Sequence, residues 1–306
     1  MVINKKIILK LFKEKKLEDY TIKLIKKYNI YYKTLEKEDK ELAIIDTVRK
    51  INNENRIVTS KNRKKIWEKG WLDINNSFKK NRSITSLIPQ FYSKRKNLYF
   101  RLNGKFIKSS KFFEFKMIDI YRSWYFSKYI KNVDNIYEFG AGSGHNLIRL
   151  SDIFPKKKIY ASDFSKNSVE LLKNISNYKN YNWSCFQFNM KNINKTITLK
   201  ENSAIFTSGS IEQLSGKINN FLKFILKNKP RICIHIEPMP QLFNNNIIED
   251  FLSVQALKKK KYSVNFLDEI KKLEKNNKIK ILKLLKSPFG SQLIDGMNLL
   301  VWKILR

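Results

Sequence analysis

The stretch that decides the fold runs from Asn135 to Ser165 and reads NIYEFGAGSGHNLIRLSDIFPKKKIYASDFS. It holds three of the chain's nine glycines, Gly140, Gly142 and Gly144, within five residues. A short apolar run precedes them, and a helical pattern from Asn146 to Ile153 follows. A strand that turns sharply into a helix needs glycine where φ is positive or a ligand approaches closely, and the helix start offers unpaired N–H groups. The stretch therefore predicts a ligand-binding loop.

A second apolar run ends at Asp163, twenty-five residues after Glu138. This offset is close to the roughly 20 residues at which an acidic side chain binds a ribose diol in nucleotide-binding folds. The glycine spacing differs from the G-x-G-x-x-G of dinucleotide-binding folds, and no Lys-Ser or Lys-Thr pair follows as in a P-loop. The pattern is instead an acidic residue, Phe139, and G-x-G-x-G.

This pattern resembles the first motif of the class I methyltransferases, which use S-adenosylmethionine (SAM). The resemblance implies that Glu138 meets the methionine amine, that Asp163 binds the ribose hydroxyls and that Asn189 pairs with the adenine edge. A glycine-rich turn in another α/β protein is the alternative interpretation. Carried over position by position, the cofactor-binding residues are Glu138, Phe139, Gly140, Ala141, Gly142, Gly144, Asn146, Asp163, Phe164, Asn189, Met190, Ser208 and Gly209.

The strongly basic composition raises the question of a nucleic-acid partner. The 306-residue chain has a formal charge of +35, but 52 of its 62 basic residues are lysine and only 10 are arginine. Recognition of phosphates and base edges depends largely on the planar fork of arginine. A lysine excess is also what an AT-rich genome produces, so we attribute most of the charge to composition and do not favour a nucleic-acid partner.

Cellular location and metal binding are constrained by what the sequence lacks. No apolar run approaches the roughly 20 residues of a membrane-spanning helix, and lysines interrupt the first apolar stretch too early for a signal peptide. We therefore expect a cytoplasmic protein. Cys185 and Cys233 lie far apart without CxxC or Cys/His spacing, so neither a disulfide framework nor a metal site is predicted.

Residues 1–131 are predicted to form a mainly helical N-terminal extension that covers the cofactor site. Apolar residues at helical spacing predict two helices within residues 4–52, and residues 61–90 are less regular. Asn103-Gly104 between two apolar runs predicts a hairpin, and an aromatic-rich helix over residues 112–130 follows.

Residues 132–306 alternate between strand and helix patterns and close with two strands, over residues 278–285 and 298–305. This alternation predicts an α/β domain. It resembles the Rossmann-like, seven-stranded methyltransferase sheet, which is parallel except for its last strand.

Two carboxylates follow neighbouring predicted strands and are the candidate catalytic residues. Glu237 is the first choice as a general base, and Glu212 is the second or an acceptor-binding group, because ligands of doubly wound sheets lie beyond the carboxyl ends of the strands. Helix capping or pairing with lysine is the structural alternative for both. Candidate acceptor-binding residues are Gln213, His235 and Trp71.

Three functions are carried forward from these observations. The leading one is methylation of a small-molecule or glycan-type metabolite, with oxygen as the favoured target and the N-terminal extension as a lid. The second is methylation of RNA or protein through the basic surface, and the third is a non-catalytic SAM-binding subunit. The Asn/Asp-Pro-Pro-Tyr box of adenine-methylating enzymes is absent after the fourth strand of the domain, which disfavours methylation of DNA bases.

Overall fold

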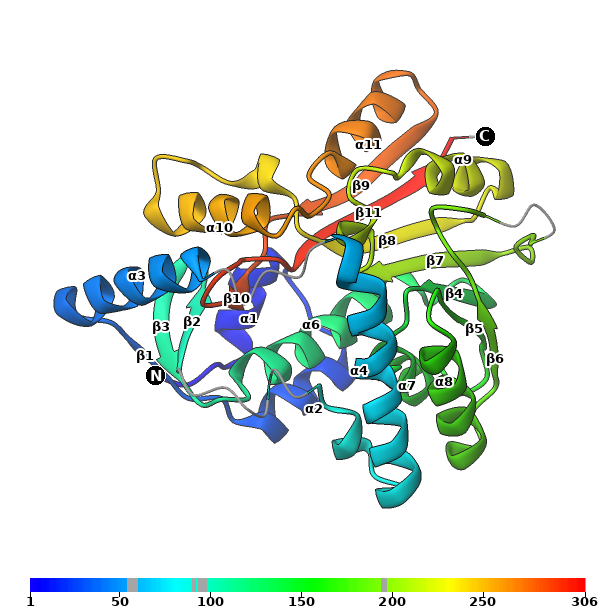
Figure 1. Cartoon of the computed structure of the whole chain (residues 1–306), viewed down its shortest axis with the longest axis horizontal. Coiled ribbons are helices and arrows are strands. Elements are labelled where there is room, and N and C mark those ends of the chain that lie inside the picture. The colour runs from blue at the N-terminus through cyan, green and yellow to red at the C-terminus, as the bar shows by residue number, and fades with distance from the viewer. Residues whose placement is uncertain (54–59, 90–91, 93–97, 194–196, 306) are drawn as a thin grey trace.

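The computed structural model describes residues 1–53, 60–89, 92, 98–193 and 197–305. A seven-stranded sheet forms its centre, in the order β6-β5-β4-β7-β8-β11-β9 (Figure 1). The strands are β4 (Asn135–Phe139), β5 (Lys158–Asp163), β6 (Trp183–Gln187), β7 (Ser203–Ser208), β8 (Ile232–Glu237), β9 (Ile279–Leu285) and β11 (Asn298–Ile304).

The direction of the strands confirms the predicted fold class. Strands β4, β5, β6, β7 and β8 pair in parallel, whereas β11 lies antiparallel between β8 and β9. The last strand of the chain is thus the one reversed strand of this sheet, as the Rossmann-like methyltransferase topology requires. Parallel strands end at the same edge, so the loops after β4, β5, β6 and β7 meet there.

Alternate residues of each strand face two separate hydrophobic clusters. In β7, Ala204 and Phe206 belong to one cluster and Ile205 to the other. The first cluster takes in α6 (Phe113–Tyr129), α7 (His145–Ile153) and α8 (Lys166–Lys179), and the second takes in α9 (Asn219–Asn228) and α11 (Phe266–Lys275). The sheet is therefore covered on both faces, as a doubly wound fold demands.

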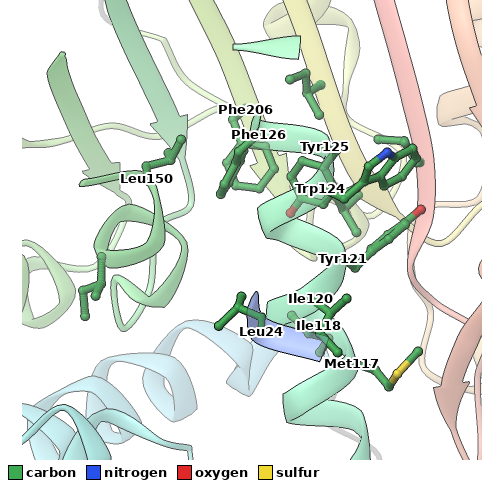
Figure 2. Packing of buried hydrophobic residues seen from close by; sticks show 14 of the residues in the cluster. Leu24, Met117, Ile118, Ile120, Tyr121, Trp124, Tyr125, Phe126, Leu150 and Phe206 are labelled. Atoms are coloured by element: carbon green, nitrogen blue, oxygen red, sulfur yellow. The ribbon is translucent and has the colours of Figure 1, made fainter. Parts of the chain in front are cut away.

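Helix α6 is the packing centre of the first cluster. Twelve of its residues are buried, and Figure 2 shows Phe126 of this helix beside Phe206 of β7. Phe126 lies edge-on to Phe206 of β7, with ring centroids 5.0 Å apart. The aromatic-rich helix predicted over residues 112–130 is thereby confirmed, and it is the element that joins the N-terminal part of the chain to the sheet.

A second sheet of four strands has the order β1-β3-β2-β10. The predicted hairpin is confirmed as β2 (Tyr99–Leu102) and β3 (Lys105–Ser109), with Asn103 and Gly104 at φ of 50° and 74°. Strand β10 (Phe289–Ser291), which the sequence did not predict, pairs with β2. The small sheet thus combines strands from both ends of the chain.

The two helices predicted within residues 4–52 are wrong in number. The structure has α1 (Lys5–Phe12), α2 (Asp19–Tyr28), the strand β1 (Tyr32–Thr34) and α3 (Lys37–Asn52). The first two helices end at Lys13 and Asn29, which adopt the left-handed conformation. No glycine or proline marks either position in the sequence, so the breaks carry no strong local signal.

Where the sequence pattern of residues 61–90 is irregular, the structure has one long helix, α4 (Ser60–Asn81), followed by a 3-10 turn, η2 (Ile84–Leu87). In Figure 1, α4 stands beside α8 at the edge of the sheet where the parallel strands end. The remaining elements are η3 (Ile211–Leu214), η4 (Pro240–Leu242) and α10 (Ile248–Lys259).

The predicted boundary between residues 131 and 132 stays a prediction. Side chains of α1 and α2 share the first hydrophobic cluster with strands of the main sheet, so the N-terminal part packs directly on that sheet. In the described part of the chain, no helix is both long and apolar enough to span a membrane.

Candidate functional site

A cavity of about 380 Å³ lies at the carboxyl ends of the parallel strands. Its floor is the glycine-rich loop after β4 together with the loops after β5, β6 and β7, and its walls come from α4 and α6. The predicted cofactor-binding residues that line it are Gly140, Ala141, Gly142, Asn146, Asp163, Phe164, Asn189, Met190, Ser208 and Gly209. The structure therefore brings together residues from four separate loops.

The glycine-rich loop is shaped as a cradle. Gly140, Gly142 and Gly144 have φ of 82°, 54° and 75°, a region that side chains other than glycine rarely occupy. A Cβ at Gly140 would lie 2.4 Å from Cβ of Ser210, and one at Gly142 would lie 2.8 Å from the ring of Trp71. The backbone can therefore pass this close to Ser210 and Trp71 only because these positions carry no side chain.

Asp163 ends β5 beneath this loop. Its Oδ2 accepts the N–H of Gly142 at 3.0 Å, and its Oδ1 accepts the N–H of Ser165 at 2.9 Å. Burial raises the pKa of the carboxyl to about 6, while the two N–H groups act in the opposite direction. The carboxylate is thus fixed at the cavity with lone pairs left over, which suits a ribose diol.

Glu138 lies one layer below the cavity and does not line it. It is fully buried, and its Oε1 accepts a hydrogen bond of 2.7 Å from Nδ2 of Asn146, which does line the cavity. Its Oε2 is buried without a hydrogen-bond partner among the described residues. Burial raises the pKa of Glu138 to about 8. A ligand amine would reach this carboxyl only beside Asn146.

Two further predicted cofactor-binding residues do not line the cavity. Phe139 is fully buried on the opposite face of the sheet, where its ring packs on Phe188 with centroids 4.6 Å apart. Gly144 is the N-cap residue of α7, and a Cβ there would lie 2.9 Å from the Leu172 side chain. Their positions indicate that Phe139 and Gly144 pack at the two ends of the glycine-rich loop and do not face the cavity.

Helix α4 forms the wall opposite the glycine-rich loop. Trp67 and Trp71 both line the cavity and stack with ring centroids 5.2 Å apart. One turn of the helix is held by Glu68, which accepts hydrogen bonds from the Ser165 hydroxyl at 2.6 Å and the Asn167 N–H at 3.3 Å. Glu68 thus binds at the N-terminal end of α8, where a negative charge is favoured. Trp71 lines the cavity, and its role as an acceptor-binding residue stays a prediction.

The two candidate catalytic carboxylates lie outside the cavity lining. Glu237 is buried, and its oxygens accept the N–H groups of Ser210 at 3.1 Å, Ile211 at 3.2 Å and Glu212 at 3.3 Å. Burial raises the pKa of Glu237 to about 7, and burial with the Glu237 charge raises that of Glu212 to about 8. These contacts give Glu237 the role of holding the loop after β7, and its predicted catalytic role stays a prediction.

Of the other two predicted acceptor-binding residues, one lines the cavity and one does not. Gln213 lines the cavity and donates a hydrogen bond of 2.7 Å to Glu212. His235 is fully buried within the sheet, where its Nδ1 lies 2.8 Å from the Thr207 hydroxyl and its ring stacks near Trp302. His235 does not line the cavity.

Sequence reasoning missed the face that α6 turns toward the cavity. Phe115, Ile118 and Arg122 recur at helical spacing and line it together with His145. The spacing was visible in the sequence, but α6 is buried on nearly all sides, so no polar face marked which stripe meets a ligand. His145, the first residue of α7, lies in the cavity wall.

The residues present fit SAM and do not form a metal centre. The three glycines with positive φ, an acidic residue at the ribose position and the orphaned Glu138 oxygen match a nucleoside with an amino-acid end. Among the described residues, no cluster of three His, Cys, Asp or Glu side chains could hold a metal ion.

Solved structures with partial similarity to this chain are methyltransferases. Magnesium protoporphyrin IX methyltransferase from Synechocystis PCC 6803, solved with bound S-adenosylhomocysteine, is 12% identical over 64% of this chain and 85% of its own, with a TM-score of 0.48. A SAM-dependent methyltransferase from Aquifex aeolicus is 17% identical over 56% of this chain and 82% of its own, with a TM-score of 0.38.

Mitomycin 7-O-methyltransferase MmcR is 10% identical over 62% of this chain, with a TM-score of 0.45, and the match spans 55% of MmcR. No protein-family model matches the chain, and no curated protein matches it. At these identities and scores the assignment of the fold rests on the strand order of the sheet itself. That order confirms the resemblance predicted from the glycine-rich motif.

Proposed function

We propose that the chain is a SAM-dependent methyltransferase whose acceptor is a small-molecule or glycan-type metabolite, methylated at oxygen. The observation that carries this proposal is the convergence of the glycine cradle, Asp163 and Asn189 on one cavity at the carboxyl edge of a methyltransferase-type sheet. SAM, when bound, supplies an electrophilic methyl group. The chain's own residues then have to hold the cofactor and align the acceptor with it.

The walls of the cavity support a small acceptor over a macromolecule. Helix α4 covers the glycine-rich loop, with Trp71 packed against Gly142, and α6 closes a second side with Phe115 and Ile118. An RNA or protein segment would need an open groove along this edge. A partly walled cavity of about 380 Å³ suits a metabolite that enters beside the cofactor.

Methyl transfer with labelled SAM tests the proposal. The protein would be incubated with labelled SAM and, separately, with hydroxylated small molecules, with free and nucleotide-linked sugars, and with bulk RNA. We expect label in at least one low-molecular-weight acceptor and none in RNA at 0.2 M salt, where diffuse lysine contacts are screened over about 8 Å. Label in RNA alone would favour the second predicted function, and SAM binding without transfer to any acceptor would favour a non-catalytic subunit.

A further inference from the structure

Helix α3 carries apolar side chains on two opposite faces. One face packs on its own chain, where Ala43 and Thr47 are buried. The other face is in solvent, and its large apolar residues Leu42, Ile45 and Val48 are 57, 46 and 41% exposed. A helix needs only one apolar stripe to pack on its own domain, so the second stripe indicates a contact surface.

The exposed face of α3 changes its charge along the helix. We call the exposed residues within about 60° of Ile45 on the helical wheel the outer stripe. They are Glu38, Glu41, Leu42, Ile45, Val48, Arg49 and Asn52. The outer stripe is therefore acidic near its start, apolar in the middle and basic near its end.

This order makes the outer stripe complementary to a second copy of itself that runs in the opposite direction. When two copies cross at Ile45, this residue faces Ile45 of the partner subunit. Leu42 then faces Val48 of the partner subunit, and Glu41 faces Arg49 of the partner subunit. Two-fold symmetry makes each of these contacts twice, so two ion pairs flank an apolar centre.

Helix α10 extends this surface with a groove. Helices α3 and α10 lie together at one end of the molecule (Figure 1). A hollow of about 300 Å³ between them is lined by Val48, Ile51, Asn52, Phe251, Leu252, Gln255, Lys258 and Lys259. In the antiparallel arrangement Glu38 of the partner subunit falls opposite Asn52, and thus close to the two lysines. The groove therefore adds a third favourable pairing of charges to each half of the contact.

Other occupants fit only one end of the outer stripe. An anionic membrane or an acidic protein would be attracted to Arg49 but repelled by Glu38 and Glu41. A basic partner would meet the opposite mismatch. A second copy of the chain satisfies the acidic and the basic end at the same time.

We propose that the outer stripe of α3 and the groove beside α10 form a two-fold interface between two copies of this chain, with the α3 helices antiparallel. The residues of the outer stripe are not among those that line the cavity at the carboxyl ends of the parallel strands. Each copy therefore keeps its own cavity, and the proposal does not depend on what that cavity binds.

Analytical ultracentrifugation over a range of protein concentrations tests the interface. Wild-type protein should show a reversible equilibrium between monomer and dimer with a micromolar dissociation constant. Ile45→Glu should raise this constant at least about a hundredfold, because two carboxylates would meet at the symmetry axis. Ile66→Glu is the matched control, since Ile66 of α4 is also 46% exposed and does not line the cavity. It should change the constant by no more than about threefold.

Two charge reversals test the antiparallel register. Glu41→Arg and Arg49→Glu should each raise the dissociation constant roughly tenfold, because like charges would then face each other at two places. An equal mixture of the two variants should form a heterodimer within about threefold of wild-type affinity, since every arginine again faces a glutamate. Native mass spectrometry identifies this heterodimer by its mass, and circular dichroism verifies that each variant is folded.

Wild-type protein that stayed monomeric at about 0.1 mM would overturn the proposal. If that monomer bound phosphatidylglycerol vesicles and Ile45→Glu did not, the outer stripe would be a membrane surface instead. A dimer that Ile45→Glu left intact, or that Ile45→Glu and Ile66→Glu weakened equally, would show that the interface lies elsewhere. A mixture of the two charge reversals that formed no heterodimer would overturn the antiparallel arrangement.

Discussion

Asp163 and Glu237 end parallel strands at the same edge of the main sheet, β5 and β8, and both are buried. Each accepts backbone N–H groups from a nearby loop. Asp163 has one such bond on each oxygen, whereas the oxygens of Glu237 accept three N–H groups in succession. Asp163 lines the cavity and Glu237 does not.

This difference shows that a residue at the end of a parallel strand lies at the edge of the sheet where the cavity is, but that its side chain need not face the cavity. The loop after β7 folds over Glu237 as the 3-10 turn η3 and uses its carboxylate as an anchor. The loop after β4 passes over Asp163 with three glycines and leaves the carboxylate open to the cavity. Loop conformation therefore decides that Asp163 faces the cavity and that Glu237 does not.

Gly140 is where the two regions meet, and its substitution should have the largest effect. In Gly140→Ala the new Cβ would collide with Ser210, whose hydroxyl is held by the Phe139 carbonyl at 3.0 Å. We expect a loss of roughly 2–5 kcal/mol in the free energy of unfolding, from backbone strain and overpacking together. Denaturant unfolding measures it.

Gly104→Ala is the control, because Gly104 has a similar φ of 74° in the hairpin turn but open space around the Cβ position. It should lose only the strain component, about 1 kcal/mol. Equal losses in the two variants would show that Ser210 yields freely and that the two loops are not tightly joined.

Asp163→Ala should weaken binding of S-adenosylhomocysteine by about ten- to a hundredfold, because each hydrogen bond to a charged group contributes roughly 1.5–3 kcal/mol. Isothermal titration calorimetry measures the affinity, and circular dichroism verifies that the Asp163→Ala protein remains folded. If Asp163→Ala and Glu237→Gln weakened the ligand equally, the contrast between the two carboxylates would be wrong.

Glu237→Gln should change the affinity for S-adenosylhomocysteine by no more than about twofold. It should lower the free energy of unfolding by roughly 1–3 kcal/mol. The amide N–H₂ would face one of the N–H groups that the carboxylate now accepts, which leaves a buried donor unsatisfied. Thermal unfolding at constant pH measures the loss. Unchanged stability together with a steep fall in turnover would instead support the predicted role of Glu237 as a general base.

The pH dependence of stability gives the smallest effect. Burial raises the pKa of Glu237 from 4.5 to about 7, so the folded state holds this proton more tightly than the unfolded state does. Its contribution to stability is complete below pH 4.5 and is lost as pH rises through 7. Because Glu237→Gln cannot titrate, wild type should lose of the order of 1–2 kcal/mol more than the variant between pH 5 and 7.

This difference would be measured by urea unfolding of both proteins across that range. Asp163 has a raised pKa of about 6 and contributes in the same direction, but it is present in both proteins and cancels. Glu212 does not cancel, because the Glu237 charge helps to raise its pKa, so both proteins are compared in a Glu212→Gln background. Parallel pH profiles for wild type and Glu237→Gln would show that Glu237 does not titrate in this window.

The glycine-rich loop could be predicted from sequence because its cause is local. Glycine adopts positive φ without strain, so Gly140, Gly142 and Gly144 mark the sharp turn, and the flanking patterns indicate the strand and helix on either side. The orientation of Glu237 depends on how a distant loop folds over it. The wall formed by Trp71 and Arg122 depends on tertiary packing of α4 and α6, which no short stretch of sequence specifies.

The same reasoning applies to the N-terminal part. Lys13 and Asn29 end helices in the left-handed conformation where the sequence carries neither glycine nor proline. Strand β10 has three residues and exists because β2 lies beside it. Such elements are fixed by their partners, so a reading of local pattern misses them.

Calorimetric titration of the wild-type protein with S-adenosylhomocysteine tests the central claim most directly, that the cavity beneath α4 is a SAM site. The account predicts saturable binding with one ligand per chain at concentrations well below 1 mM, where the binding free energy exceeds about 4 kcal/mol in magnitude. Absence of any heat or saturation at millimolar ligand would contradict it.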